Sequence, residues 1–146
     1  MEQKKHIAIL GSTGSIGTQA LEVIAGNRDR FEVEVLTAQN NAELLIRQAL
    51  EFNPNIVVIR NEDKYAQVRD ALADTDTKVF AGEEAIASVM ETASVDMVLT
   101  ATVGFSGLKP TLRAIAAGKA IALANKETLR SEEHTSELQS HHDLVC

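Results

Sequence analysis

Three glycines spaced three residues apart form the feature of this sequence best suited to chemistry. Gly11, Gly14 and Gly17 follow the apolar run Ile7–Leu10 directly, and a helical pattern comes after them. A strand that passes through a glycine turn into a helix can hold a phosphate, because the helix N-terminus offers N–H groups and a positive dipole. The three glycines would permit the tight turn, close approach of the phosphates, and close packing of helix on strand, in that order. The spacing is GxxGxxG rather than the commoner GxGxxG, so a tight turn in some other α/β protein is the alternative to a dinucleotide site.

The residues after the second predicted strand bear on which dinucleotide would bind. An NAD site usually places Asp or Glu there to bond the ribose 2′-hydroxyl, whereas an NADP site lacks that acid. This chain has Gln39, Asn40 and Asn41, which are neutral donors, and neither an acid nor a cation. The missing carboxylate favours NADP, although an Asn-rich turn with Asn41 as a helix cap would look the same.

Two later segments also follow apolar strands. Ala101–Thr111 contains Gly104 and Gly107, which would let the backbone approach a ribose or nicotinamide, or could belong to an ordinary strand-to-helix loop. Leu123–Thr128 carries Asn125, Lys126 and Glu127. A lysine at this edge of a sheet can hold a substrate anion, and the same residues could equally begin a solvated helix.

The elements that would position these residues alternate between strand and helix. Strands are expected at 7–10, 31–36, 56–59, 79–80, 95–100 and 120–124, and helices at 18–25, 41–52, 62–73, 82–90 and 110–117. Glu32 and Glu34 alternate with apolar residues, which predicts a second strand less buried on one face. Alternation of this kind predicts an α/β fold, a Rossmann-like doubly wound and mostly parallel sheet with helices on both faces.

Composition narrows the functional classes. The chain has 146 residues, 45% of them apolar, and a net charge of -7, which argues against a nonspecific nucleic-acid surface. One cysteine, Cys146, excludes an internal disulfide. The N-terminus lacks the apolar region of a signal peptide and no run is long enough to cross a membrane, so a cytoplasmic protein is expected.

The last segment, Arg130–Cys146, differs in character from the rest. It is polar and has no amphipathic stripe. Its histidines His134, His141 and His142, with Cys146, match no common zinc spacing. The string RSEEHTSELQS resembles the in-frame translation of a sequencing-library adapter, so we expect residues 1–129 to form the domain and 130–146 to be a non-native, disordered tail.

Three motifs together resemble 1-deoxy-D-xylulose 5-phosphate reductoisomerase. They are GSTGSIG at Gly11–Gly17, VGxxGLxPT at Val103–Thr111 and LANKET at Leu123–Thr128. Their order and spacing are similar to the amino-terminal, NADPH-binding part of that enzyme family, and the resemblance covers Lys5 to Leu129.

The resemblance implies a reaction and its partners. The family converts 1-deoxy-D-xylulose 5-phosphate, a small phosphorylated sugar, to 2-C-methyl-D-erythritol 4-phosphate in non-mevalonate isoprenoid biosynthesis. The whole enzyme is a homodimer that uses NADPH and a divalent metal, Mg or Mn. The family's acidic metal ligands lie downstream of LANKE, so the resemblance places no metal and no catalytic residue within this chain, and the fragment alone is expected to be inactive.

The resemblance also assigns roles to individual positions. The turn around the pyrophosphate matches Thr13, Gly14, Ser15 and Ile16. The loop at the adenosine 2′-phosphate matches Gln39, Asn40 and Asn41, where family members often carry a glycine and then a basic residue. Two cofactor-contacting positions match Asn125 and Glu127, and a substrate-binding lysine matches Lys126.

Two other functions stay open at this point. Another NADP-dependent reductase, such as a semialdehyde dehydrogenase, would need a catalytic cysteine within the fold, and Cys146 lies in the suspected tail. A non-catalytic domain that binds a dinucleotide for regulation would also fit the glycine turn.

Overall fold

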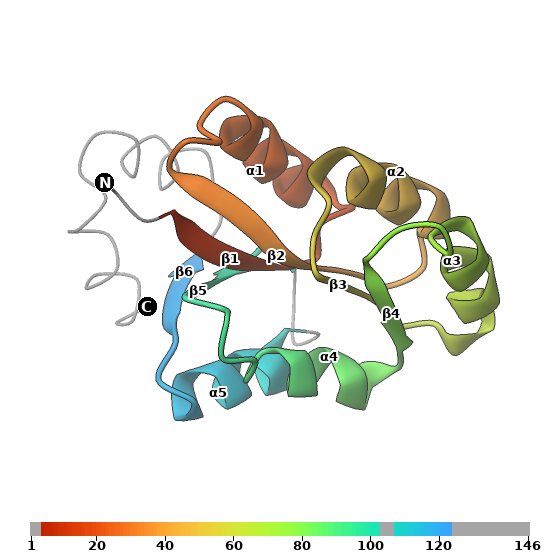
Figure 1. The fold of residues 1–146 in the computed structure, drawn as a ribbon. Coiled ribbons are helices and arrows are strands. Elements are labelled where there is room, and N and C mark those ends of the chain that lie inside the picture. Colours follow the sequence, from red (N-terminus) through yellow and green to blue (C-terminus); the bar gives the residue numbers. More distant parts are fainter. Residues whose placement is uncertain (1–3, 103–106, 124–146) are drawn as a thin grey trace.

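A six-stranded parallel sheet forms the centre of the computed structural model, which describes residues 4–102 and 107–123 (Figure 1). The strands are β1 Lys5–Leu10, β2 Phe31–Ala38, β3 Ile56–Ile59, β4 Lys78–Ala81, β5 Met97–Thr100 and β6 Ala120–Leu123. The helices are α1 Ser15–Ala25, α2 Ala42–Phe52, α3 Tyr65–Ala71, α4 Glu83–Val89 and α5 Leu108–Ala116.

The strand order is β4-β3-β2-β1-β5-β6, and every neighbouring pair is parallel. The chain therefore starts in the middle of the sheet, winds outward to β4, and returns to place β5 on the other side of β1. Figure 1 shows α1, α2 and α3 over one face and α4 and α5 over the other. This is the predicted Rossmann-like, doubly wound arrangement, and the prediction is confirmed.

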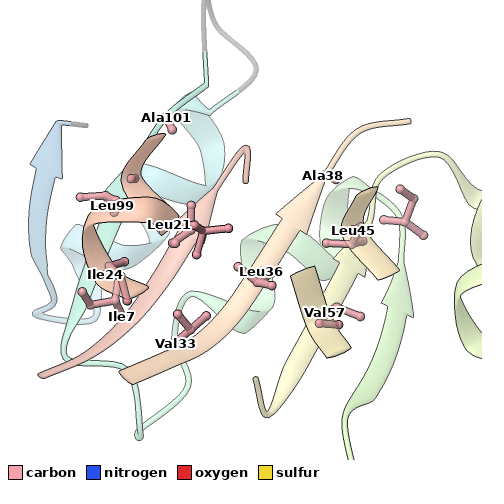
Figure 2. Packing of buried hydrophobic residues seen from close by; sticks show 14 of the residues in the cluster. Ile7, Leu21, Ile24, Val33, Leu36, Ala38, Leu45, Val57, Leu99 and Ala101 are labelled. Carbon is pink, nitrogen blue, oxygen red and sulfur yellow. The ribbon is translucent and has the colours of Figure 1, made fainter. Parts of the chain in front are cut away.

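The larger core cluster lies between the sheet and the first three helices. Ile24 of α1 packs with Ile7 and Val33, and Leu45 of α2 packs near Val57, as Figure 2 shows. Because helices cover both faces, the strands are rich in Val, Ile and Leu rather than alternating with polar residues. Burial of each such side chain contributes about 1.5–3 kcal/mol to folding.

One prediction about β2 is wrong. Glu34 was expected on a more exposed face, but it is only 8% exposed, because helices and loops cover both sides of the strand. Its carboxylate is hydrogen-bonded, which makes burial tolerable. It accepts hydrogen bonds from Asn55 Nδ2 at 3.0 Å and Ser94 Oγ at 2.9 Å. His6 Nδ1 lies 3.0 Å from its other oxygen.

Several element boundaries differ from expectation. The segment expected as one helix over 62–73 is a 3-10 turn, Glu62–Lys64, followed by the shorter α3. Asn61 caps this turn, because its Oδ1 accepts a hydrogen bond from the Asp63 N–H at 3.0 Å. The α1 helix begins three residues earlier than the apolar pattern indicated, directly after Gly14. By contrast, β3 has the predicted bounds.

Among the helices of the described residues, none combines the length and the apolar character that a membrane span requires.

Candidate functional site

The turn between β1 and α1 needs glycine at two positions for reasons within the protein itself. Gly11 has a φ of +83°, and a Cβ there would lie 2.8 Å from Thr102 Cγ2. A Cβ on Gly17 would collide with the Gly11 carbonyl oxygen. The expected roles of both glycines, tight turning and close helix packing, are confirmed.

Gly14 is different, because the protein does not forbid a side chain at this position. Its backbone is extended, with φ -75° and ψ 173°, a conformation open to any residue. The nearest heavy atom to an added Cβ is the Gly11 carbonyl oxygen, 4.0 Å away. Gly14 also lines a pocket. A ligand in that pocket would be a reason for glycine here, since the fold supplies none.

Hydrogen bonds between the turn and Thr37 of β2 hold the turn in place. The Ser12 N–H donates to the Thr37 carbonyl oxygen at 2.8 Å, and the Gly11 N–H donates to Thr37 Oγ1 at 3.1 Å. Thr37 Oγ1 in turn donates to the Ile9 carbonyl oxygen at 3.2 Å. Thr37 therefore fixes where the turn leaves the sheet.

A buried polar pair fixes the other side of the turn. Ser12 Oγ donates to Gln48 Oε1 at 2.7 Å, and Gln48 Nε2 donates to the Ser12 carbonyl oxygen at 2.9 Å. Both residues are buried. Sequence reasoning missed them as positioning residues. The available signal was a polar Gln48 beside Leu45 and Ala49 on the apolar face of α2.

The N-terminus of α1 directly follows the turn. The first N–H groups of a helix have no carbonyl partner within it. Gly14 as N-cap supplies no side-chain acceptor, and the first turn of α1, all of it described, contains no acidic residue. The N–H groups of Ser15 and Ile16 are therefore placed to meet an anion, with the helix dipole favouring negative charge.

Seven of the predicted residues meet around one pocket of about 470 Å³. The residues that were expected there and line it are Thr13, Gly14, Ser15, Ile16, Gln39, Asn40 and Asn41. Gly11, Ala101 and Thr102 complete the lining. The Ala101 N–H donates to the Leu10 carbonyl oxygen at 2.8 Å, which holds the end of β5 beside the turn.

The pocket lies where the sheet reverses its winding direction. The turn follows β1, Gln39–Asn41 follows β2, and Ala101 follows β5, so all three come from the carboxyl ends of adjacent strands. Open α/β sheets bind ligands at this position, outside the strand ends at the topological switch point. Asn41 also caps α2 as predicted, because its Oδ1 accepts from the Leu44 N–H at 3.1 Å.

Other expected site residues lie outside the described residues. These are Gly104, Asn125, Lys126 and Glu127. The suspected tail, residues 130–146, also lies outside the described residues. Gly107 is described and directly precedes α5. Part of the second motif and the polar residues of the third are therefore not placed relative to the pocket.

A second polar cluster, His6 with Glu32 and Glu34, lies at the amino ends of β1 and β2. His6 Nδ1 is 3.3 Å from Glu32 Oε2 and 3.0 Å from Glu34 Oε1. The three could offer ligand atoms to one metal ion. However, Glu34 already accepts two hydrogen bonds, and the cluster lies at the opposite edge of the sheet from the pocket. It is not part of the candidate site.

Comparison with known proteins agrees with the geometry of the pocket. The model of the 1-deoxy-D-xylulose 5-phosphate reductoisomerase family matches residues 7–131. Curated relatives of that name include one from Bacteroides thetaiotaomicron, 62% identical over 127 residues, which covers 87% of this chain and 33% of the relative. The chloroplastic enzyme of Oryza sativa subsp. japonica is 49% identical, over 86% of this chain and 27% of its own length.

Solved structures of the same enzyme share the fold. The reductoisomerase from Zymomonas mobilis in complex with NADPH superposes with a TM-score of 0.79 and 37% identity, over 94% of this chain and 35% of that one. A reductoisomerase in complex with NADPH, fosmidomycin and magnesium gives a TM-score of 0.78 and 35% identity, over 95% and 34% of the two chains. The chain thus spans about a third of the length of the relatives that it matches.

Proposed function

This chain belongs to the 1-deoxy-D-xylulose 5-phosphate reductoisomerase family, and on that premise we propose that it forms the NADPH-binding part of such an enzyme. The observation that carries the proposal is the pocket at the switch point, lined by the turn from Thr13 to Ile16, by Gln39–Asn41 and by the end of β5. Relatives of the family have been solved with NADPH bound.

The pocket has features that a dinucleotide requires. The pyrophosphate fits the N–H groups at the start of α1, and the open space beside Gly14 allows its close approach. The end of β2 presents Gln39, Asn40 and Asn41, so no carboxylate of this tripeptide repels a 2′-phosphate. Thr37 and Gln48 hold the turn before any ligand arrives, which limits the entropy lost on binding.

The reaction of the whole enzyme is also a proposal. NADPH, when bound, supplies the hydride that reduces the rearranged sugar phosphate. The residues of this chain would bind and orient the cofactor, with Asn125 and Glu127 as further cofactor contacts and Lys126 as a contact to the substrate, as the family resemblance suggests. Relatives bind magnesium, which supports a divalent cation, Mg or Mn, in the whole enzyme. The same resemblance supports a homodimer acting on 1-deoxy-D-xylulose 5-phosphate, and a cytoplasmic location is a further part of the proposal.

We also propose a domain boundary within the chain. We assign residues 1–129 to the NADPH-binding part and 130–146 to a non-native tail, on the likeness of RSEEHTSELQS to an adapter translation. Sequencing the native gene across codon 130 tests this assignment. An uninterrupted genomic reading frame through RSEEHTSELQS would contradict it.

The site can be tested with a substitution that should weaken NADPH binding without destabilising the fold. Gly14→Asp places a carboxylate at the N-cap of α1, where aspartate is favoured and the backbone accepts it. The melting temperature should stay equal or rise slightly. NADPH affinity should fall at least about tenfold, because the new charge lies beside the expected pyrophosphate. Calorimetric titration and circular dichroism measure the two effects.

Gly14→Asn is the matched control, since it has nearly the same size and no charge. We expect it to bind NADPH better than Gly14→Asp does, because only the aspartate repels the phosphates. Equal NADPH affinity in the wild type and Gly14→Asp would show that the pyrophosphate does not bind at this turn. A wild-type chain that is folded and binds no NADPH would refute the proposed function itself.

A further inference from the structure

Arg60 comes from a different strand than the predicted 2′-phosphate loop, yet the sheet places it beside that loop. It directly follows β3, which pairs with β2 so that Ile59 lies opposite Ala38. The ladder continues past both strand ends. The Arg60 N–H donates to the Ala38 carbonyl oxygen at 2.8 Å, and the Asn61 N–H donates to the Gln39 carbonyl oxygen at 2.9 Å. The backbone of Arg60 is therefore fixed next to Gln39.

A second pocket, of about 360 Å³, adjoins the dinucleotide pocket at this point. Gln39 and Asn40 line both pockets. Arg60, Asn61, Glu62 and Glu83 complete the second one. Within the described part of the chain, Arg60 is the sole positively charged residue that lines either pocket.

The side chain of Arg60 can still bind an anion. It is 44% exposed, and its Nη2 donates to Glu83 Oε1 at 3.0 Å. A guanidinium has five N–H donors in a planar fork that suits phosphate, so this one contact leaves donors for a ligand. Beside it, Asn40 Oδ1 accepts from Asn61 Nδ2 at 3.0 Å. That bond occupies the amide oxygen of Asn40 and leaves its NH₂ group as the donor for a ligand.

We infer that Arg60 binds the adenosine 2′-phosphate and so makes this chain prefer NADPH over NADH; the inference rests on the proposed NADPH site. A 2′-phosphate is doubly charged near neutral pH, and NADP sites often supply a cation for it. The loop Gln39–Asn41 offers neutral donors alone. Arg60 supplies the missing charge from the neighbouring strand.

Two carboxylates act against this preference. Glu62 and Glu83 line the same pocket, and both would repel a phosphate. Glu83 also neutralises part of the Arg60 charge while it holds the guanidinium in place. Removal of the Glu83 charge by Glu83→Gln should therefore strengthen NADPH binding and leave NADH binding nearly unchanged.

Calorimetric titrations of the full chain with NADPH and with NADH test the inference. Arg60→Gln should weaken NADPH binding about tenfold and change NADH binding by less than about twofold, because only NADPH carries the 2′-phosphate. Arg60→Lys keeps a charge but loses the planar fork, so its loss should be intermediate. Arg28→Gln is the matched control, since Arg28 is similarly exposed and pairs with Glu51 at the opposite edge of the sheet. It should bind both dinucleotides as the wild type does.

The outcomes separate this inference from the proposed function. Arg60→Gln with an unchanged ratio of NADPH to NADH affinity would overturn the role of Arg60 while the dinucleotide site stands. Equal losses for both dinucleotides would also overturn it, because they would indicate a general effect on the pocket. A folded wild-type chain that binds neither dinucleotide would refute the proposed function, and this inference with it.

Discussion

At the scale of single residues, the three glycines of the turn between β1 and α1 are explained by two different causes. Gly11 and Gly17 are glycines because the protein's own atoms leave no room, at Thr102 and at the Gly11 carbonyl respectively. Gly14 has room for a side chain. The structural glycines and the glycine available to a ligand thus alternate within one heptapeptide, in the order that the motif predicts.

Gln48 provides a prediction at this scale. Gln48→Leu should lower the free energy of unfolding by about 1–3 kcal/mol, because the buried Ser12 hydroxyl and carbonyl lose their partners. It should also weaken NADPH binding, since the turn loses one of its anchors. Chemical denaturation and the NADPH titration measure both effects.

Gln67→Leu is the control for this change, because Gln67 is exposed on α3. Its unfolding free energy should stay within about 0.5 kcal/mol of the wild type. If Gln48→Leu were as stable as Gln67→Leu, the Ser12–Gln48 pair would not anchor the turn.

Residue types along the chain were enough to predict most of the pocket lining. Thr13–Ile16 and Gln39–Asn41 are local to strand ends, so their motif and position indicate their place. The contacts of Thr37 and Gln48 to the turn, and the proposed role of Arg60, were not predicted. Their importance depends on the register of β1, β2 and β3 and on the docking of α2, which a linear pattern does not specify.

At the scale of elements, α4 and α5 are joined by charged side chains on the face of the sheet away from α1. Arg113 Nη1 lies 3.1 Å from Glu84 Oε1, and Arg113 Nε lies 2.8 Å from Glu91 Oε2. Lys109 Nζ lies 2.7 Å from Glu84 Oε2. Hydrogen bonds from Lys109 and then Arg113 lower the pKa of Glu84, and the hydrogen bond from Arg113 lowers the pKa of Glu91.

The lowered pKa values of the two carboxyls predict a dependence on pH. A carboxyl whose pKa is lower in the folded state stabilises the fold above its ordinary pKa of 4.5, and this contribution is lost as pH falls through the folded value. The wild type should therefore melt higher than Arg113→Gln near neutral pH. The difference should shrink below pH 4.5, and at high salt, since the groups are exposed.

Melting curves of both proteins between about pH 3 and pH 7 check this. Arg69→Gln is the comparison, because Arg69 pairs with its sequence neighbour Asp70 and joins no two elements. A difference between wild type and Arg113→Gln that stays constant through this range would contradict the proposed link between α4 and α5.

Elements themselves were predicted well where strong local signals exist. Asn41 marked the start of a helix that the structure confirms, because its side chain caps α2. The split at 62–73 was missed because no Gly or Pro separates Glu62–Lys64 from α3 in the sequence, whereas the Asn61 cap favours a separate turn. The burial of Glu34 was missed because its partners Asn55 and Ser94 are distant in sequence.

At the scale of the whole molecule, the winding of the sheet creates the site. β1 starts the chain in the centre, and the return to β5 opens a crevice between two strand ends that no single segment could form. The alternation of strand and helix patterns along the sequence predicted this architecture, because apolar parallel strands need helices on both faces of the sheet. The chain matches the first third of the reductoisomerases, and the crevice is the feature that this part would contribute to the whole enzyme.

A crystal structure of the chain with bound NADPH would show directly whether the dinucleotide occupies the pocket at the carboxyl ends of the strands. We expect the pyrophosphate against the N–H groups of Ser15 and Ile16, and the 2′-phosphate between Asn40 and Arg60. NADPH bound away from the carboxyl ends of β1, β2 and β5, for example beside His6 at the amino edge of the sheet, would contradict it.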